Sequence, residues 1–299
     1  MSKTYYLGID GGGTKTELVL VDETGAIVSR AIGSVSSIDT ITLCESMKSV
    51  LETFKKMNAD VEVSAIFAGI GGIASDLDCK KYATALRELP FVASDARIEA
   101  KNDVYAALAS GRGTLDGMTI ILGTGAVCFG IRDGVSWRCG GYHFKEGDAG
   151  SAFDLGFHAL KYYARVVDGR YEPSEFSEAI KKQLGLSDFS SLVTYFDHLN
   201  RTEVAKFAPL VTAFGTVNQY AYKILVDAAE EVKLLVEGVY RNLGFDQTTL
   251  SIIGGLGNAK TLYRQLFIQN IKKIAPNIEI IESLYNPAHA MAILAMKLK

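Results

Sequence analysis

The sequence predicts an α/β protein made of two related domains that face each other across a cleft. A strand, a glycine loop, a second strand, a turn and a third strand open the chain, and the same order recurs about 110 residues later. Helical and apolar strand patterns follow each copy, which is typical of α/β folds. The length of 299 residues is enough for two domains of ordinary size.

Composition narrows the function classes. With 48% hydrophobic and 22% charged residues, the chain reads as a soluble globular protein, and its net charge of −3 gives no reason to expect nucleic acid or an anionic membrane as partner. No apolar stretch approaches the ~20 residues of a membrane span, and the N-terminus has no signal-peptide core, so we expect a cytoplasmic protein. The four cysteines are widely spaced and form no CxxC pair, which indicates neither a disulfide framework nor a zinc site.

The first domain is expected at residues 1–115, completed by a C-terminal helix at 286–299. Three strands should form an antiparallel meander, followed by alternating helices and strands. We expect strands at 5–9, 17–21, 26–32, 61–70 and from 97, and helices at 41–54, 82–89 and from 103.

The second domain is expected at residues 116–285, after a glycine-rich connector at 110–117, and it carries a helical insertion. The closing helix should pack back onto the first domain. We expect strands at 118–122, 127–131, 135–139, 250–253 and 278–281, and helices at 156–167, 174–184, 204–214, 217–243, 263–274 and 288–298.

The segment GIDGGGTKT, residues 8–16, places an acidic residue and three glycines at the tip of a strand pair. Gly11, Gly12 and Gly13 let the backbone turn tightly and let an anion approach main-chain N–H groups, beside the hydroxyl of Thr14 and the charge of Lys15. Asp10 would repel a bare phosphate but would attract one through Mg²⁺. The alternative is a hairpin turn in which Asp10 caps the chain and Lys15 is a solvated strand residue.

Two further glycine segments have related chemistry. LGTGA, residues 122–126, again joins two strands and offers Gly123, Thr124 and Gly125 to a phosphate. IIGGLGN, residues 252–258, is a strand that opens through glycines toward a helix, a shape that lets an adenine ring lie against bare backbone. Read alone, this third segment could equally be a structural turn.

In this order, the three segments resemble the phosphate and adenosine motifs of the fold shared by sugar kinases, actin and the Hsp70 ATPase domain. The chain looks most like the BadF/BadG/BcrA/BcrD ATPase family, and within it the N-acetylglucosamine kinase branch. KNDVYAAL at 101–108 and GGYHFKEGDAGSAFDLG at 140–156 are similar to the family's sugar-binding segments. The resemblance implies two ribonuclease H-like (actin-like ATPase) domains with a central cleft.

The resemblance also implies an ATP-dependent kinase that phosphorylates a hydroxyl of an amino sugar such as N-acetylglucosamine. Asp103 would be the general base, although an aspartate that opens a helix is often only an N-cap. Asp10 would hold Mg²⁺. The ATP and phosphate contacts implied are Gly11, Gly12, Gly13, Thr14, Lys15, Gly123, Thr124, Gly125, Gly254, Gly255 and Asn258. The substrate contacts implied are Ser37, Gly71, Asp103, Tyr142 and Asp148, where Asp148 could instead cap the following helix. We expect a homodimer acting on a small-molecule sugar, with ATP and Mg²⁺ as cofactors.

Departures from the family pattern concern the acceptor. GSVSS at 33–37 replaces a segment that carries a sugar-binding asparagine, the second phosphate loop reads GTGA where GTGSN is common, and Tyr142 stands where tryptophan is frequent. These differences leave the sugar's identity open. His158 and His198 have no aspartate or serine at triad or metal spacing, so we expect them to be structural.

Two other functions are compatible with the resemblance. The family contains ATPase activators of 2-hydroxyacyl-CoA dehydratase and benzoyl-CoA reductase systems, which share an iron–sulfur cluster held by cysteines of two subunits. None of the four cysteines lies in a CxxG-type loop, and Cys128 falls in a predicted strand. The other function is a non-catalytic sugar or nucleotide sensor, which usually carries a helix-turn-helix segment ahead of the first strand.

Overall fold

The computed structural model describes residues 4–146 and 148–298 and divides into two compact units. Unit 1 comprises Met1–Asp116 with Glu282–Lys299, and unit 2 comprises Gly117–Ile281. The predicted outer domain limits, residues 1 and 299, lie outside the described residues, as does Gly147. Within the described residues, no helix combines the length and the apolar character needed to cross a bilayer.

Unit 1 contains a five-stranded mixed sheet in the order β3-β2-β1-β4-β5. The first three strands pair antiparallel, which confirms the predicted meander, whereas β4 pairs parallel with both β1 and β5. The strands are β1 (Tyr5–Gly11), β2 (Thr16–Asp22), β3 (Ile27–Gly33), β4 (Val63–Ile70) and β5 (Val92–Asn102).

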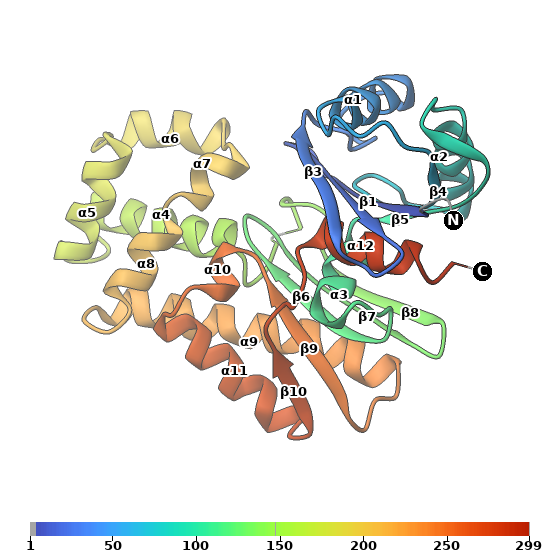
Figure 1. Cartoon of the computed structure of the whole chain (residues 1–299). Helices are drawn as coiled ribbons and strands as arrows, with labels where there is room; N and C mark the ends of the chain where they lie inside the picture. The colour runs from blue at the N-terminus through green and yellow to red at the C-terminus, as the bar shows by residue number, and fades with distance from the viewer. Residues whose placement is uncertain (1–3, 147, 299) are drawn as a thin grey trace. The chain divides into compact units, whose positions relative to one another are not determined.

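Helices cover both faces of this sheet (Figure 1). On β2, Leu18 and Leu20 join the apolar cluster under two of the helices, whereas Val19 and Val21 pack against the C-terminal helix. Because both faces of β2 are covered, residues 18–21 form a continuous apolar run. The first face carries α1 (Leu43–Lys55) and α2 (Asp76–Arg87), and the second carries α3 (Val104–Arg112) and α12 (Pro287–Ala295). The closing helix therefore packs on the first unit, as predicted.

Unit 2 repeats the same sheet, with strand order β10-β9-β6-β7-β8. β6, β7 and β8 form the antiparallel meander, and β9 pairs parallel with β6 and β10. The internal repeat inferred from the sequence is thus a repeat of topology. The strands are β6 (Gly117–Leu122), β7 (Ala126–Arg132), β8 (Val135–Gly140), β9 (Thr248–Ile253) and β10 (Ile278–Ile281).

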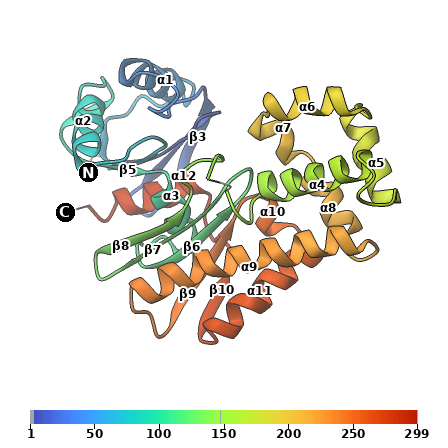
Figure 2. The same ribbon diagram turned by 180° about the vertical axis from the view of Figure 1, so that it is seen from behind.

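The helices of unit 2 share one apolar core with its sheet. The long helix α9 runs along the sheet with α11 beside it (Figure 2). Helices α4 to α8 lie between β8 and α9 in the chain, and the short helix α10 follows β9. The helices of unit 2 are α4 (Ala152–Val167), α5 (Glu175–Leu184), α6 (Phe189–Asp197), α7 (Arg201–Ala205), α8 (Ala208–Phe214), α9 (Gln219–Asn242), α10 (Gly255–Asn258) and α11 (Leu262–Ile274).

The structure differs from the predicted elements in several places. The helix expected at 204–214 is two helices, because Pro209 has no N–H to continue α7 and instead begins α8. Helix α6, capped by Asp188, was not predicted. The connector expected at 110–117 is helical up to Arg112, and Gly117 already begins β6.

Candidate functional site

The carboxyl ends of three parallel strands in unit 1 bring the predicted residues together. Asp10 lies near the end of β1, Gly71 follows β4 directly, and Asp103 follows β5 directly. Because the parallel strands β1, β4 and β5 are neighbours, these ends meet at one edge of the sheet. Asp103 Oδ2 lies 3.5 Å from the position that a Cβ on Gly71 would take.

The first glycine loop is fixed by backbone hydrogen bonds. The amide of Gly12 donates to the carbonyl of Lys15 over 3.0 Å, and the amides of Ser36 and Ser37 both donate to the carbonyl of Gly12 over 3.3 Å. The amide of Gly71 donates to Gly11 over 2.8 Å. The loop therefore has a defined shape without any ligand.

Packing requires glycine at one position of this loop but not at the other two. A Cβ on Gly11 would collide with the Ser36 hydroxyl, so packing explains Gly11. Gly12 and Gly13 have no positive φ, and the nearest atoms to their Cβ positions lie 3.6 and 3.4 Å away. Neither backbone strain nor packing requires glycine at these two positions. Close approach of a ligand would explain both.

Negative charge gathers around Asp10. Burial, then the charges of Asp103 and Glu17, raise the pKa of Asp10 to about 7 against an opposing effect of Lys15. Glu17 is buried with a side chain 1% exposed, and it forms ion pairs with Arg30 and, at 3.3 Å, with Lys15. Lys15 lies in the turn before β2 rather than in a strand. An excess of carboxylates, of which those of Asp10 and Asp103 are half-buried, fits a divalent cation.

No group of three or more histidine, cysteine, aspartate or glutamate side chains within residues 4–146 and 148–298 is arranged to hold a metal by itself. A Mg²⁺ held by one carboxylate, waters and substrate phosphates does not need such a group.

Asp103 occupies the N-cap position of α3, but its side chain does not accept the capping hydrogen bond. The neighbouring Asn102 instead accepts the amide of Val104 through Oδ1 over 3.2 Å. The Asp103 carboxylate therefore does not cap α3, which was the alternative left open by the sequence.

Ser37 is buried near the same strand ends, and its hydroxyl donates to Asp39 Oδ1 over 2.5 Å. A Cβ on Gly71 would collide with that hydroxyl, so Ser37 and Gly71 lie side by side. The carbonyl of Gly71 also accepts the amide of Ile38 over 3.0 Å. The connection after β3 is thus bound to the end of β4.

In unit 2, the two remaining glycine segments are adjacent because β6 and β9 are parallel neighbours. Gly254 has a φ of 98°, and a Cβ there would collide with the Leu122 carbonyl and lie 3.2 Å from the Gly123 nitrogen. Gly123 and Gly255 have no positive φ, and no atom lies within 4 Å of their Cβ positions. As at positions 12 and 13, neither backbone strain nor packing requires glycine at these two positions.

The second glycine loop is bound to the start of α4. The amides of Ala152 and Phe153 donate to the carbonyls of Gly123 and Thr124 over 2.9 and 3.2 Å. Thr124 itself is exposed. Asn258 is also exposed, at the end of α10, and its amide donates to Gly254 over 3.1 Å.

Asp148 is the residue whose environment differs most from expectation. Its residue surface is 2% exposed, its φ is +43°, and its Oδ2 lies 2.6 Å from Nη2 of Arg201 in an ion pair. The cap of α4 is Ser151, whose hydroxyl accepts the amide of Asp154 over 3.2 Å. The capping alternative for Asp148 was therefore wrong.

Arg201 was not found from the sequence, and no local pattern could have found it. It lies 53 residues after Asp148 at the start of a short helix, and its contact arises only through the packing of α7 on α4. His158 also has an unexpected partner, since its Nδ1 lies 3.0 Å from Asp154 Oδ1 one turn earlier in α4. Asp154 accepts the Gly150 amide over 2.8 Å as well, so this pair fixes the segment before the helix.

The remaining predicted residues lie in the loop after β8. Tyr142 is 78% exposed, and the amide of Lys145 donates to Nδ1 of His143 over 3.2 Å.

Cys128 is buried in β7, opposite Cys139 of β8. Burial raises the pKa of the Cys128 thiol, which is the behaviour of an inert core cysteine rather than of a cluster ligand.

Comparison with known proteins identifies the family of this chain. The BadF/BadG/BcrA/BcrD ATPase family matches residues 7–295, nearly the whole described chain. The chain belongs to this family. The resemblance read from its glycine segments is thereby confirmed.

Individual proteins similar to this chain share less than a third of their residues with it. An N-acetyl-D-glucosamine kinase of Dictyostelium discoideum is 29% identical over 320 aligned positions, covering 100% of both chains. An N-acetylmuramic acid/N-acetylglucosamine kinase of Clostridium acetobutylicum is 29% identical, covering 97% of this chain and 98% of its own. The solved structure of a candidate N-acetylglucosamine kinase from Chromobacterium violaceum shares the fold, with a TM-score of 0.78, 24% identity and coverage of 98% and 99%.

Proposed function

We propose that the chain is an ATP-dependent kinase that transfers the γ-phosphoryl group to a hydroxyl of an amino sugar such as N-acetylglucosamine. The observation that carries this proposal is the edge of the unit 1 sheet, which brings Asp10 and Asp103 together. The loop after β1 at this edge contains Gly12 and Gly13, which neither strain nor packing requires. Two relatives at 29% identity over almost their whole length are described as kinases of N-acetylglucosamine, which supports the choice of acceptor.

In this proposal the phosphates of ATP bind at glycine loops. In unit 1 the contacts are Gly11, Gly12, Gly13, Thr14 and Lys15, and in unit 2 they are Gly123, Thr124 and Gly125, with Gly254, Gly255 and Asn258 at the adenosine. Main-chain N–H groups next to glycines can approach phosphate oxygens without interference from a Cβ. Asp10 would hold Mg²⁺, which would supply positive charge next to the phosphate groups.

Asp103 acts on the acceptor. Its carboxylate accepts the proton of the sugar hydroxyl as the oxygen attacks the γ-phosphorus. One P–O bond forms to the sugar oxygen, and the bond between the γ-phosphorus and the bridging oxygen breaks, which releases ADP. We further assign Ser37 and Gly71 in unit 1, and Tyr142 and Asp148 in unit 2, to contacts with the acceptor.

The test is an ADP-release assay with glucosamine, N-acetylglucosamine, N-acetylmuramic acid, N-acetylmannosamine and glucose as acceptors. We expect turnover with at least one amino sugar and a dependence on added Mg²⁺. ADP release that is the same with and without every sugar would overturn the proposal.

We also propose that the kinase is a cytoplasmic homodimer. The edge strand β3 supports the dimer, since Ile27, Val28 and Ile32 are all about half exposed on it. Light scattering on the purified protein tests the mass, and a monomer at micromolar concentration would contradict it.

A further inference from the structure

Arg201 and Asp148 form an ion pair with one buried and one half-exposed partner. The Asp148 side chain is 1% exposed and that of Arg201 is 41% exposed, and Nη2 lies 2.6 Å from Oδ2. A carboxylate taken out of water needs an opposite charge or several hydrogen-bond donors to remain ionised. In unit 2, Arg201 supplies that charge.

The fold holds Arg201 in this place through α7. Asn200 caps the helix by accepting the amides of Thr202 and Glu203 over 3.0 and 3.1 Å. One turn later, the carbonyl of Val204 lies so close to Gly156 of α4 that any Cβ on residue 156 would collide with it. The guanidinium is therefore presented by a helix that is packed backbone to backbone on α4.

The second glycine loop leaves room for the pair. A Cβ on Gly125 would collide with Nη2 of Arg201 and would lie 2.9 Å from Oδ1 of Asp148. Gly125 has no positive φ, and a side chain there would displace the Arg201 guanidinium from its present position. Arg201 also has a buried Nε with no hydrogen-bond partner among the residues that the structure describes.

The segment that carries Asp148 is held at two of its carbonyl groups. The amide of Ser151 donates to the Asp148 carbonyl over 2.9 Å, and Tyr263 donates its hydroxyl hydrogen to the carbonyl of Gly150. The Asp148 backbone has a φ of +43°, and its Oδ2 faces Nη2 of Arg201 in an ion pair that is not a hydrogen bond of standard geometry.

We propose that Arg201 is a positioning residue for the acceptor sugar. Through its ion pair with Oδ2 it orients the Asp148 carboxylate, so that Oδ1 accepts hydrogen bonds from sugar hydroxyls. An ionised carboxylate only accepts, and hydroxyl groups donate, so the chemistry is complementary. This role rests on the proposed kinase function and deepens it, because it assigns acceptor affinity to a residue outside the glycine segments.

The experiment compares Arg201→Gln and Arg201→Lys with the unchanged protein. Acceptor KM, ATP KM, kcat and the melting temperature are measured for each, and acceptor binding without ATP is measured by calorimetry. We expect Arg201→Gln to raise the acceptor KM and Kd by about 10- to 100-fold, the range for a lost hydrogen bond to a charged group. ATP KM should stay within about twofold, and Arg201→Lys should recover part of the loss because it retains the charge.

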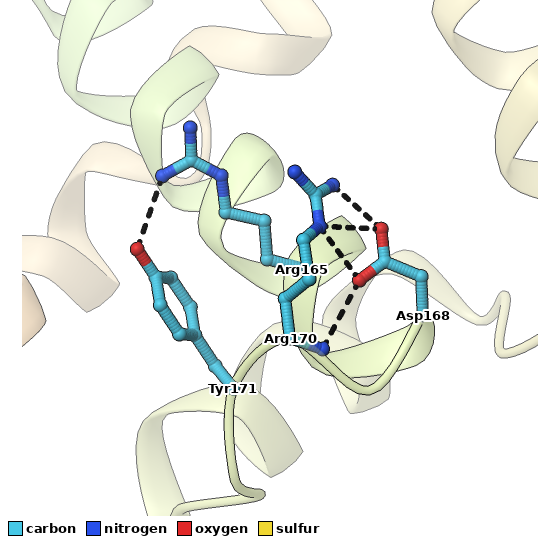
Figure 3. A network of polar contacts seen from close by, with 4 residues as sticks. All are labelled: Arg165, Asp168, Arg170 and Tyr171. Atoms are coloured by element: carbon cyan, nitrogen blue, oxygen red, sulfur yellow. Dashed lines mark hydrogen bonds and ion pairs between the residues drawn. The ribbon is translucent and has the colours of Figure 1, made fainter.

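The matched control is Arg170→Gln. Arg170 also pairs with an aspartate, Asp168, but in an exposed turn after α4, where the side chains are 60% and 32% exposed (Figure 3). The guanidinium contacts both carboxylate oxygens there, so the geometry is at least as good as that of the Arg201 pair. An exposed pair contributes little, and Arg170→Gln should leave both KM values unchanged.

A double-variant cycle distinguishes positioning from direct phosphate contact. If Arg201 acts through Asp148, then adding Arg201→Gln to Asp148→Asn should change acceptor KM by less than about twofold. This double variant also removes both charges, so it keeps the test available if Arg201→Gln alone does not fold. A rise in ATP KM with unchanged acceptor KM would overturn the proposal in favour of a phosphate contact. If the unchanged protein phosphorylates a sugar and Arg201→Gln leaves acceptor KM unchanged, only the positioning role is overturned. If the unchanged protein phosphorylates no sugar, the kinase function is overturned as well.

Discussion

Val204 and Gly156 lie backbone to backbone, with the Val204 carbonyl carbon only 2.9 Å from the position that a Cβ on residue 156 would take. The contact joins α7 to α4, and Val204 is completely buried in it. Gly156 closes the segment at 140–156 that indicated an acceptor site in the sequence. Its place in that segment is explained by packing, since the contact brings Arg201 to Asp148.

Gly156→Ala should therefore affect both stability and acceptor binding. The added methyl group has no space, because the opposing atoms are backbone, and we expect a loss of about 1–3 kcal/mol in the free energy of unfolding. Displacement of α7 should also raise acceptor KM in the direction of Arg201→Gln. Urea denaturation and steady-state kinetics measure the two effects.

Gly169→Ala is the control for this prediction. Gly169 follows α4 with a φ of 79° and open space around its Cβ position, so alanine there should cost about 1 kcal/mol through backbone strain alone. Acceptor KM should be unchanged. If Gly169→Ala raised acceptor KM as much as Gly156→Ala, general destabilisation would explain both and the contact would have no role in positioning.

Asp103→Asn should abolish sugar phosphorylation while ATP binding remains. Asparagine keeps the shape but cannot accept a proton, and the loss of a general base typically reduces kcat by about 10²–10⁴-fold. Asp95→Asn, which removes an exposed carboxylate in β5, is the control and should keep full activity. Equal losses of turnover and ATP affinity in Asp103→Asn would contradict the assignment as base.

Gly123→Ala and Gly254→Ala should separate ligand binding from folding. Gly123 has open space and no positive φ, so alanine should leave stability within about 1 kcal/mol, yet its methyl group would stand where a phosphate approaches. We expect ATP KM to rise about 10-fold through loss of a charge-assisted hydrogen bond. Gly254 has a φ of 98° and contacts Leu122, so alanine there should cost about 1–3 kcal/mol.

Thermal melts and ATP titrations measure these two variants. A Gly123→Ala protein that is fully folded and binds ATP normally would remove the second glycine loop from the phosphate site. Gly255→Ala offers an independent comparison, because Gly255 has the same open surroundings.

The elements found correctly from the sequence are those with local signals. The strands of both meanders have apolar side chains bounded by glycine turns, and each was placed to within a few residues. The sheet edge at which Asp10 and Asp103 lie could also be predicted from the sequence, because parallel strands place their carboxyl ends together. Helix α6 was missed although Asp188 caps it.

The parts of the site that could not be predicted depend on contacts between distant segments. Nothing around position 201 distinguishes Arg201 from other surface arginines before α7 is packed on α4. Glu17 lies opposite Asp10 in the register of β1 and β2, and its charge raises the pKa of Asp10. The burial of Glu17 and its ion pair with Arg30 are seen only in the structure. The glycine segments were identified from the sequence. Only the structure shows that packing requires glycine at position 254 and does not require it at position 123.

The raised pKa of Asp10 has a consequence for stability in the absence of metal. In the folded protein its pKa is about 7, against 3.8 for the ordinary side chain. Between these values the unfolded state has released the proton that the folded state retains, so the unfolded state becomes relatively more stable as pH rises from about 4 to about 7. Above pH 7 both states are ionised, and the penalty stays constant.

Asp10→Asn removes this penalty, because asparagine resembles the protonated acid and does not titrate. In EDTA, the variant should gain stability over the unchanged protein by an amount that grows from near zero at pH 4 to the order of 1–3 kcal/mol at pH 7 and then levels off. Denaturation midpoints at half-unit pH intervals measure the gap, with Asp95→Asn as a control that should show no such growth. A gap that narrowed as pH rose would mean that the surroundings of Asp10 favour its charge, and the carboxylate cluster would then not be a site poised for a cation.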